Sequence, residues 1–285
     1  MASRTPVYLA AAVQMTSTEQ FEANWLNARR LARRAVGAGA SFVALPENFA
    51  FLRTSPKGSL PISACRELPE RLAALAVELS AWLLAGSIPE RIRGDRRIYN
   101  ASVLYAPDGA EVARYRKMHL FDIRIPGKVV FRESATVRAG TEPVLAETPL
   151  GRIGLSICYD LRFPELYRQL SGAGAQLLLV PAAFTAYTGR FHWLPLLRAR
   201  AIENLCWVVA PAQVGVHGGG RESFGHSVVI DPWGTVVAER ARGAGVVTAE
   251  IDLDRVREVR AGLPSLRHVH RELTGASRVR IERCR

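Results

Sequence analysis

The spacing of apolar residues early in the chain alternates between that of strands and that of helices. Residues 7–14 form a short apolar run rich in β-forming side chains, and residues 20–36 carry apolar side chains at the spacing of an amphipathic helix. The same reasoning predicts a buried strand over 41–45, a helix over 69–79 and a strand over 82–88. Buried strands that alternate with helices are typical of layered α/β folds.

Turn residues further along the chain predict a hairpin and then a long loop. Residues 99–105 and 111–116 are predicted strands joined by the turn Pro107–Gly109. A long irregular stretch is predicted from Met118 to Thr141, with a turn at Pro126-Gly127. A loop of this length in a compact domain is usually functional.

The remaining predicted elements complete a mixed α/β chain. They are strands over 153–157 (after a hairpin turn at 149–152), 176–181, 206–210, 223–230, 235–238 and 246–251, a helix that begins at Pro164, a helix over 193–204, and turns at 217–220 and 231–234. No repeat, low-complexity tract or linker divides them, so we expect one domain over residues 1–285. We place its core at about 6–265 and a C-terminal arm at about 266–285.

Composition narrows the class of protein. The 285 residues are 48% hydrophobic and 22% charged, which is the balance of a folded globular protein. No run approaches the roughly 18 apolar residues of a membrane helix. The four cysteines are widely spaced and form no Cys-x-x-Cys pair, which argues against a disulfide scaffold or a structural zinc site. We therefore expect a cytoplasmic protein with no membrane partner.

The net charge of +12 raises the question of nucleic-acid binding. Only three of the 38 basic residues are lysines, and the arginines are spread along the chain among acidic residues. Neither an arginine-rich tail nor a set of aromatic stacking residues is evident. The pattern favours a solvated basic surface, and we expect no nucleic-acid partner.

Four residues stand out as candidates for chemistry. Cys158 lies between a buried strand and a predicted helix, where backbone N–H groups can stabilise a thiolate. Glu47 and Lys117 each follow a predicted strand, and Glu133 lies in the long loop. A lysine in an arginine-dominated chain indicates a place that needs a compact point charge. By position alone, however, Cys158 could be a buried structural cysteine, and the charged residues could be ordinary surface groups.

Several segments together resemble a known family. They are Leu45–Glu47, Tyr115–Asp122, Arg132–Ser134 and Ile157–Glu165, which are similar, in order and over nearly the whole chain, to the signature motifs of the nitrilase superfamily of carbon–nitrogen hydrolases. Residues 188–193, 198–204 and 225–234 bring the chain closest to the amidase branch that acts on deaminated glutathione or α-ketoglutaramate. Residues 121–128 look more like the subgroup that acts on α-ketoglutaramate, whereas residues 227–234 look more like the subgroup that acts on deaminated glutathione.

The resemblance implies a fold, an assembly and a set of catalytic residues. The fold would be a four-layer αββα sandwich, usually paired into a homodimer or a higher homo-oligomer. The catalytic triad would be Glu47, Lys117 and Cys158, supported by Glu133 and by the backbone N–H of Tyr159. The partner would be a small-molecule amide that bears a carboxylate, hydrolysed through a cysteine thioester, and no metal or organic cofactor is required.

Substrate contacts are predicted less directly. We expect them from Arg162, Phe184, Thr185, Arg190 and His192, all of which lie in or near the matching motifs. The branch commonly has Pro-Ala before the His192-Trp193 pair, whereas this chain has Arg190-Phe191. The resemblance therefore does not determine the shape of the substrate pocket.

Two readings from other classes compete with the amidase. A catalytically silent binding or scaffold protein would keep the fold alone, but it would have no reason to retain Glu47, Lys117 and Cys158 together. A Cys-His protease would pair Cys158 with His119, His192 or His226, none of which has a protease-like local context.

Overall fold

The structure, a computed structural model, describes residues 7–54, 62–125, 129–270 and 279–284. One sheet contains β1 (Val7–Gln14), β2 (Phe42–Ala44), β3 (Trp82–Arg91), β4 (Ile98–Tyr105), β5 (Glu111–Arg116) and β16 (Gly245–Asp252), in the order β16-β1-β2-β3-β4-β5. The other contains β8 (Val144–Thr148), β9 (Gly151–Leu155), β10 (Leu177–Leu179), β11 (Trp207–Ala210), β14 (Ser227–Ile230), β15 (Val236–Arg240) and β17 (Arg280–Arg283), in the order β15-β14-β11-β10-β9-β8-β17.

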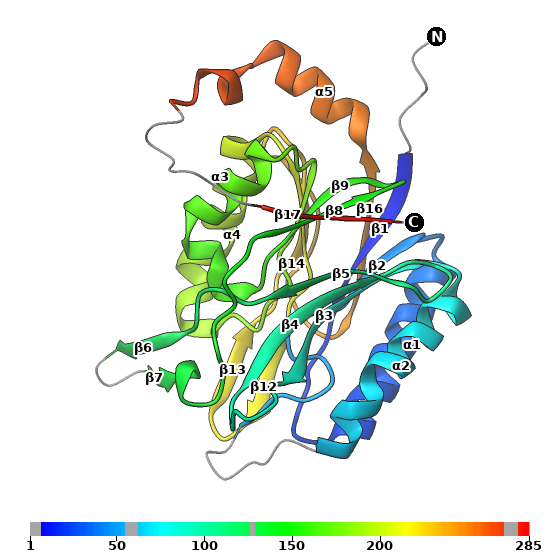
Figure 1. Ribbon diagram of the computed structural model, residues 1–285, viewed down its shortest axis with the longest axis vertical. Coiled ribbons are helices and arrows are strands. Elements are labelled where there is room, and N and C mark those ends of the chain that lie inside the picture. Colours follow the sequence, from blue (N-terminus) through cyan, green and yellow to red (C-terminus); the bar gives the residue numbers. More distant parts are fainter. Residues whose placement is uncertain (1–6, 55–61, 126–128, 271–278, 285) are drawn as a thin grey trace.

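Helices cover the outer faces of the two sheets. They are α1 (Phe21–Gly37) and α2 (Ile62–Leu79) on the first sheet, and α3 (Pro164–Gly172) and α4 (Ala186–Asn204) on the second, followed by α5 (Leu253–Gly262). Short 3-10 turns lie at η1 (Glu133–Ala135), η2 (Cys158–Arg162) and η3 (Ser265–His268). Figure 1 shows the resulting helix–sheet–sheet–helix layers, which confirm the predicted αββα sandwich.

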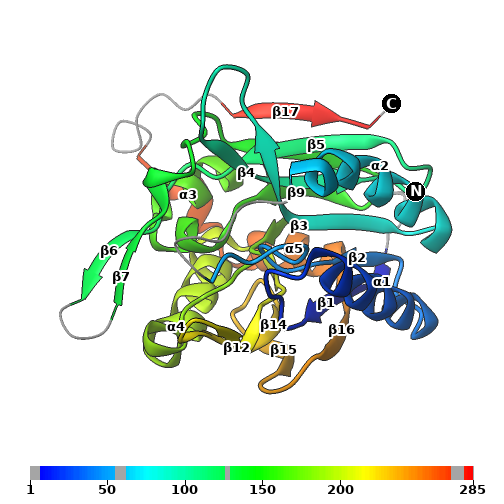
Figure 2. The same cartoon turned by 90° about the horizontal axis from the view of Figure 1, so that it is seen from below.

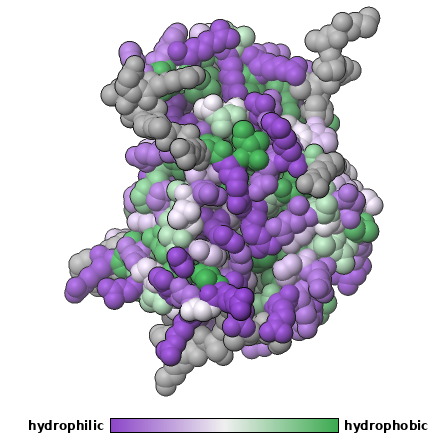
Figure 3. All heavy atoms as spheres, in the orientation of Figure 1, coloured by the Kyte–Doolittle hydropathy of each residue, from purple (hydrophilic) through white to green (hydrophobic). Residues whose placement is uncertain are grey.

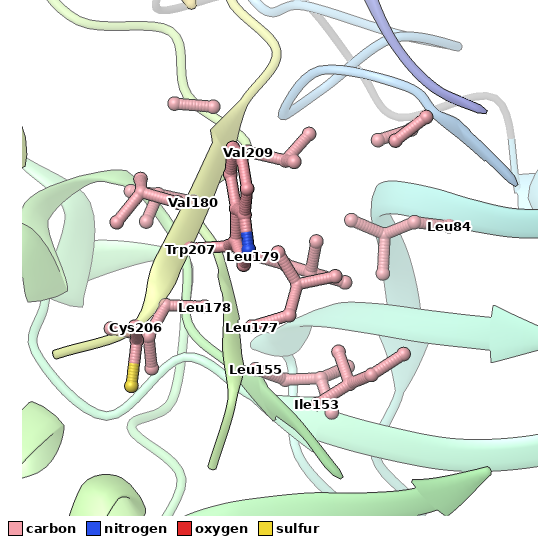
Figure 4. Packing of buried hydrophobic residues seen from close by; sticks show 14 of the residues in the cluster. Leu84, Ile153, Leu155, Leu177, Leu178, Leu179, Val180, Cys206, Trp207 and Val209 are labelled. Atoms are coloured by element: carbon pink, nitrogen blue, oxygen red, sulfur yellow. The ribbon is translucent and has the colours of Figure 1, made fainter. Parts of the chain in front are cut away.

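The central strands are apolar throughout because both of their faces are buried. In β1, Ala10 and Ala12 belong to the core between the two sheets, whereas Ala11 and Val13 belong to the core beneath α1 and α2. Figure 4 shows Leu84 of β3 pointing toward the leucines of β10 across the space between the sheets. The hydrophobic effect therefore holds all four layers together.

The long loop predicted from 118 to 141 is wrong in part, because it contains a hairpin. Strands β6 (Asp122–Ile125) and β7 (Val129–Arg132) pair antiparallel and project from the layered body (Figures 1 and 2). The β-branched residues on both strands suit this pairing. The turn predicted at Pro126-Gly127 lies outside the described residues.

The single strand predicted over 223–230 is also wrong. The chain forms β13 (Arg221–Phe224), breaks at Gly225-His226, and continues as β14. Both residues of the break have positive φ, 77° and 57°, so the strand cannot run straight through them. β13 pairs instead with β12 (Val214–Gly218), and this separate hairpin lies beside the site described below.

Other differences concern element boundaries. α2 and α4 begin several residues before the predicted starts and carry Pro69 and Pro195 inside them. β17, within the predicted C-terminal arm, adds to the second sheet by pairing with β8.

Charged and polar side chains cover most of the face in Figure 3. Among the described residues, no helix is both long and apolar enough to cross a membrane.

Candidate active site

The loops at the carboxyl ends of three strands bring the predicted catalytic residues together. Glu47 follows β2, Lys117 follows β5, and Cys158 comes shortly after β9. β2 lies next to β1 and β3 in one sheet, and β9 lies next to β10 in the other, so the site spans the two sheets. Strand ends of an open α/β sheet are common places for active sites.

Lys117 is the centre of a buried ion cluster. Its Nζ lies 2.9 Å from Glu47 Oε1, and 3.1 and 3.0 Å from the two carboxylate oxygens of Glu133. The side chain of Lys117 is only 2% exposed. Burial by itself would lower the pKa of Lys117, but the charges of Glu133 and Glu47 raise it well above its ordinary value. The Lys117 side chain is therefore a cation held in place by two carboxylates.

Glu47 is held by hydrogen bonds to both carboxylate oxygens. Asn100 Nδ2 donates to Oε1 at 3.0 Å, and the backbone N–H of Ala183 donates to Oε2 at 2.8 Å. Burial opposes ionisation, yet the Lys117 ammonium and the hydrogen bonds lower the pKa of Glu47 below its ordinary value. Glu47 is therefore a carboxylate aimed at the position of the cysteine. Sequence reasoning missed Asn100, because nothing local distinguishes it from any other strand residue.

Cys158 adopts a left-handed backbone conformation, with φ of 48°. This conformation is uncommon for a non-glycine residue and is typical of functional sites. The backbone N–H of Cys158 donates to the carbonyl of Pro181 at 3.0 Å, which fixes the turn, and the thiol is a hydrogen-bond partner of Glu47.

The thiol of Cys158 is protonated in this environment. Burial, followed by the negative charge of Glu47, raises its pKa well above the ordinary value, and Lys117 opposes the shift. The expectation that the strand-to-helix junction stabilises a thiolate is therefore wrong. A short 3-10 turn, η2, lies between Cys158 and the start of α3 at Pro164, and the carboxylate of Glu47 has the largest effect of the neighbouring charges on the thiol. To react as a nucleophile, Cys158 would need a neighbouring base to accept its proton, and Glu47 is in place for this.

Asp160 connects the lysine segment with the cysteine segment. Its buried carboxylate accepts hydrogen bonds from Tyr115 Oη at 2.7 Å and from the backbone N–H of His119 at 3.0 Å. The ring Nδ1 of His119 also lies 2.7 Å away. Asp160 thus ties the residues on either side of Lys117 to the turn that carries Cys158. It was not predicted as functional, although its place two residues after the cysteine could have signalled the role.

Aromatic rings surround Tyr159, the residue after Cys158. The Tyr159 ring lies 4.9 Å from Phe121 and 5.4 Å from Phe163, edge to face in both cases. The Arg162 guanidinium stands 5.7 Å from the Tyr159 ring and 5.2 Å from the Phe184 ring. Arg162 is therefore a cation in contact with Tyr159, the residue after Cys158.

Only some of the other predicted substrate residues lie near Arg162. His192 Nδ1 lies 3.3 Å from Arg162 Nη1. Thr185 precedes α4 and its hydroxyl pairs with that of Thr188 at 2.7 Å. Arg190 is exposed and forms no ion pair within the described residues. The structure thus groups Arg162 and His192 with Phe184, but not Arg190.

The three histidines that a Cys-His protease could use have other partners. His119 lies against Asp160, His192 lies against Arg162, and His226 stacks on Phe224 with ring centroids 4.1 Å apart. None of these rings is hydrogen-bonded to the Cys158 thiol in the part of the chain that is described.

Comparisons with known proteins identify the family of the chain. A family model described as carbon-nitrogen hydrolase matches residues 9–261. Deaminated glutathione amidase of Synechocystis is 48% identical over 265 residues, which cover 92% of this chain and 97% of that protein. The crystal structure of the NitFhit protein of Caenorhabditis elegans has a TM-score of 0.87 at 42% identity, covering 95% of this chain and 66% of that one.

A solved amidase shows the same fold with a modified cysteine. It is a glutamate-to-glutamine variant of the amidase from Nesterenkonia sp. AN1, with the acetamide moiety of fluoroacetamide added covalently at the active-site cysteine. It has a TM-score of 0.75 at 26% identity and covers 90% of this chain and 95% of that one. Because the family model matches residues 9–261 and the Synechocystis relative is 48% identical over most of the chain, this chain belongs to the carbon–nitrogen hydrolase family.

Proposed function

We propose that the protein is an amidase that hydrolyses deaminated glutathione through a thioester on Cys158. The observation that carries the proposal is the contact of Glu47, Lys117 and Cys158 in one buried cluster. The Synechocystis relative that carries this name supports the choice of substrate. A silent scaffold would gain nothing from burying two carboxylates and an ammonium, because the burial of charge is costly.

Acylation begins with the neutral thiol. Glu47 accepts the proton of Cys158 as the sulfur attacks the amide carbonyl, and the C–S bond forms. The Lys117 ammonium and the backbone N–H of Tyr159 stabilise the oxyanion. Glu47 then gives its proton to the departing nitrogen, the C–N bond breaks, and a neutral amine or ammonia leaves.

Deacylation reuses the same carboxylate. Glu47 takes a proton from a water molecule, the hydroxide attacks the thioester carbonyl, and Lys117 again faces the oxyanion. When the C–S bond breaks, the proton held by Glu47 returns to the sulfur of Cys158. Glu133 positions Lys117 throughout, because both of its oxygens contact Nζ.

A free carboxylate on the substrate would find a cation beside the nucleophile. Arg162 stands over the Tyr159 and Phe184 rings and next to His192, and these residues form the proposed substrate contacts. A hydrogen bond to a charged group contributes about 1.5 to 3 kcal/mol. We therefore expect amides with a free carboxylate to react faster than neutral amides.

The second candidate substrate is α-ketoglutaramate. It is favoured by the segment 121–128, of which 126–128 lie outside the described residues. The two substrates share a small amide and a free carboxylate, and direct comparison of kcat/KM separates them. An assembly as a homodimer and a location in the cytoplasm are part of this proposal. The homodimer rests on the resemblance, and sedimentation of the purified protein tests it. The cytoplasmic location rests on the composition of the chain, which has four widely spaced cysteines.

The decisive experiment replaces the nucleophile. Cys158→Ala should reduce turnover to below about a tenth of wild type with an unchanged thermal melt, and wild-type protein mixed with substrate should gain the mass of an acyl group on Cys158. Cys65→Ala is the matched control, because Cys65 is a buried cysteine in α2 outside the site. Full activity of the Cys158→Ala variant would disprove the proposed mechanism.

A further inference from the structure

The ionic groups of the cluster leave it with a net negative charge. Glu47 and Glu133 contribute two carboxylates, and Lys117 contributes one ammonium. An anionic substrate that approaches this cluster is repelled unless further cations compensate. The proposed amide substrate carries at least one carboxylate, so the cations around the cluster decide which anions can bind.

Arg221, on β13, is such a cation, and the sequence did not single it out. Its guanidinium stands 5.3 Å from the centre of the Phe131 ring. Phe131 lies 5.9 Å from Phe121, whose ring contacts Tyr159, the residue after the nucleophile. Arg221 is thus linked to the nucleophile turn through a row of three aromatic rings.

The charge of Arg221 interacts electrostatically with the reacting groups. Burial lowers its pKa, and the negative charges of Glu47, Cys158 and Glu133 act against that shift. Arginine titrates so far above neutrality that the group stays cationic. The contacts with the Phe131 ring of β7 and with the carbonyl of Arg53 place the guanidinium beside β7 and β13, where the charges of Glu47, Cys158 and Glu133 act on it.

The described residues use only part of the hydrogen-bonding capacity of Arg221. Nη1 donates to the backbone carbonyl of Arg53 at 3.1 Å. No carboxylate of the described residues lies within ion-pair distance of Arg221, whereas Lys117 pairs with both Glu47 and Glu133. A guanidinium carries five N–H donors in a planar fork that matches a carboxylate. The remaining donors are available to a ligand.

The hairpin that carries Arg221 is fixed to the catalytic loops. His217 of β12 contacts the carbonyl of Ser17 through Nδ1 and the hydroxyl of Ser223 through Nε2, both at 2.8 Å. The amide of Gln213 donates to the backbone carbonyl of Glu47 at 3.0 Å. Arg221 is therefore a preorganised group whose position is set relative to Glu47, as a substrate-binding cation requires.

We infer that Arg221 is a specificity-determining residue that binds a carboxylate of the substrate, in addition to Arg162. The two guanidinium groups stack on different rings, Arg221 on Phe131 and Arg162 on Tyr159 and Phe184. Arg221 and Arg162 would each bind a different carboxylate of the substrate. The site therefore fits an amide with one carboxylate on the acyl half and one on the amine half better than an amide with a single carboxylate. This inference rests on the proposed function.

The test compares Arg221→Gln with wild type on four amides: one neutral, one with a carboxylate on the acyl half, one with a carboxylate on the amine half, and one with both. We expect kcat/KM to fall about 10- to 100-fold, mainly through KM, for the substrates whose carboxylate meets Arg221. The neutral amide should change by less than about threefold. Arg221→Lys should restore part of the loss, because it keeps the charge but not the fork.

Arg124→Gln is the matched control. Arg124 is an exposed arginine on β6, in the hairpin whose other strand carries Phe131, so its loss reports the effect of removing one positive charge nearby. An equal fall in kcat/KM for all four amides, or a fall no larger than that of Arg124→Gln, would overturn the inference. If the wild-type protein itself does not prefer carboxylates, the substrate part of the proposed function fails instead.

Discussion

Replacement of Lys117 by arginine keeps the positive charge and should still remove most of the activity. Nζ of Lys117 fits between Glu47 at 2.9 Å and Glu133 at 3.0 Å, and its side chain is 2% exposed. A planar guanidinium is larger than an ammonium and cannot occupy this space without displacing a carboxylate or entering the place of the substrate carbonyl. Charge alone is therefore not sufficient at this position.

The size of the effect follows from the two roles of the side chain. Loss of one oxyanion donor costs about 10² to 10³ in kcat in comparable acyl-transfer sites. Overfilling a packed interior costs about 1 to 3 kcal/mol of unfolding free energy. For a protein of this length that corresponds to a decrease in Tm of about 2 to 5 °C. We expect a folded variant with kcat reduced at least about 100-fold.

Steady-state kinetics and a thermal melt measure the two quantities on the same sample. Arg116→Lys is the control, since Arg116 is the exposed neighbour in β5 and pairs with Glu90 at 2.6 Å on the surface. An exposed ion pair contributes about 1 kcal/mol or less, so kcat should not change. A Lys117→Arg variant with near-normal kcat and an unchanged melt would refute the assignment of Lys117 to the oxyanion.

Two further predictions concern Glu47 and His217. Glu47→Gln should reduce both acylation and deacylation by about 10² to 10⁴, because one carboxylate serves both proton transfers; a normal single-turnover burst would contradict this. Burial lowers the pKa of His217 from 6.5 to about 4. The folded state therefore resists a proton that the unfolded state accepts, so the free energy of unfolding should fall as pH decreases from 6.5 toward 4, by roughly 3 kcal/mol at most. Denaturation at several pH values should show a shallower slope for His217→Gln, and equal slopes would exclude this group as the cause.

Short-range patterns in the sequence were enough to predict the main layers. The helix over 20–36 and the strand over 82–88 correspond to α1 and β3 with small shifts at their ends. Such elements depend on the periodicity of side chains a few positions apart, which a single sequence displays directly. The proposed catalytic residues Glu47, Lys117 and Cys158 were predicted because they lie in short contiguous motifs, each after a predicted strand.

Long-range contacts decided the chemistry of those residues. Glu47 accepts a hydrogen bond from Ala183, 136 positions away, and its cation comes from Lys117, 70 positions away. Burial of Cys158 beside a carboxylate makes the thiol neutral, the opposite of what its place before a helix suggests. A pKa depends on desolvation and on neighbouring charges, and neither quantity exists before the chain is folded.

The same distinction explains the elements and residues that the sequence did not reveal. The β6–β7 hairpin and the break at Gly225-His226 depend on how the strands pair, since the apolar pattern there fits more than one register. Arg221 is one arginine among many in the sequence. Only the tertiary structure, by setting β13 against the loop of Arg53 and the ring of Phe131, distinguishes it from the arginines of the surface. Residue types and local periods were encoded along the chain, whereas proximity, burial and free hydrogen-bonding capacity arose from packing.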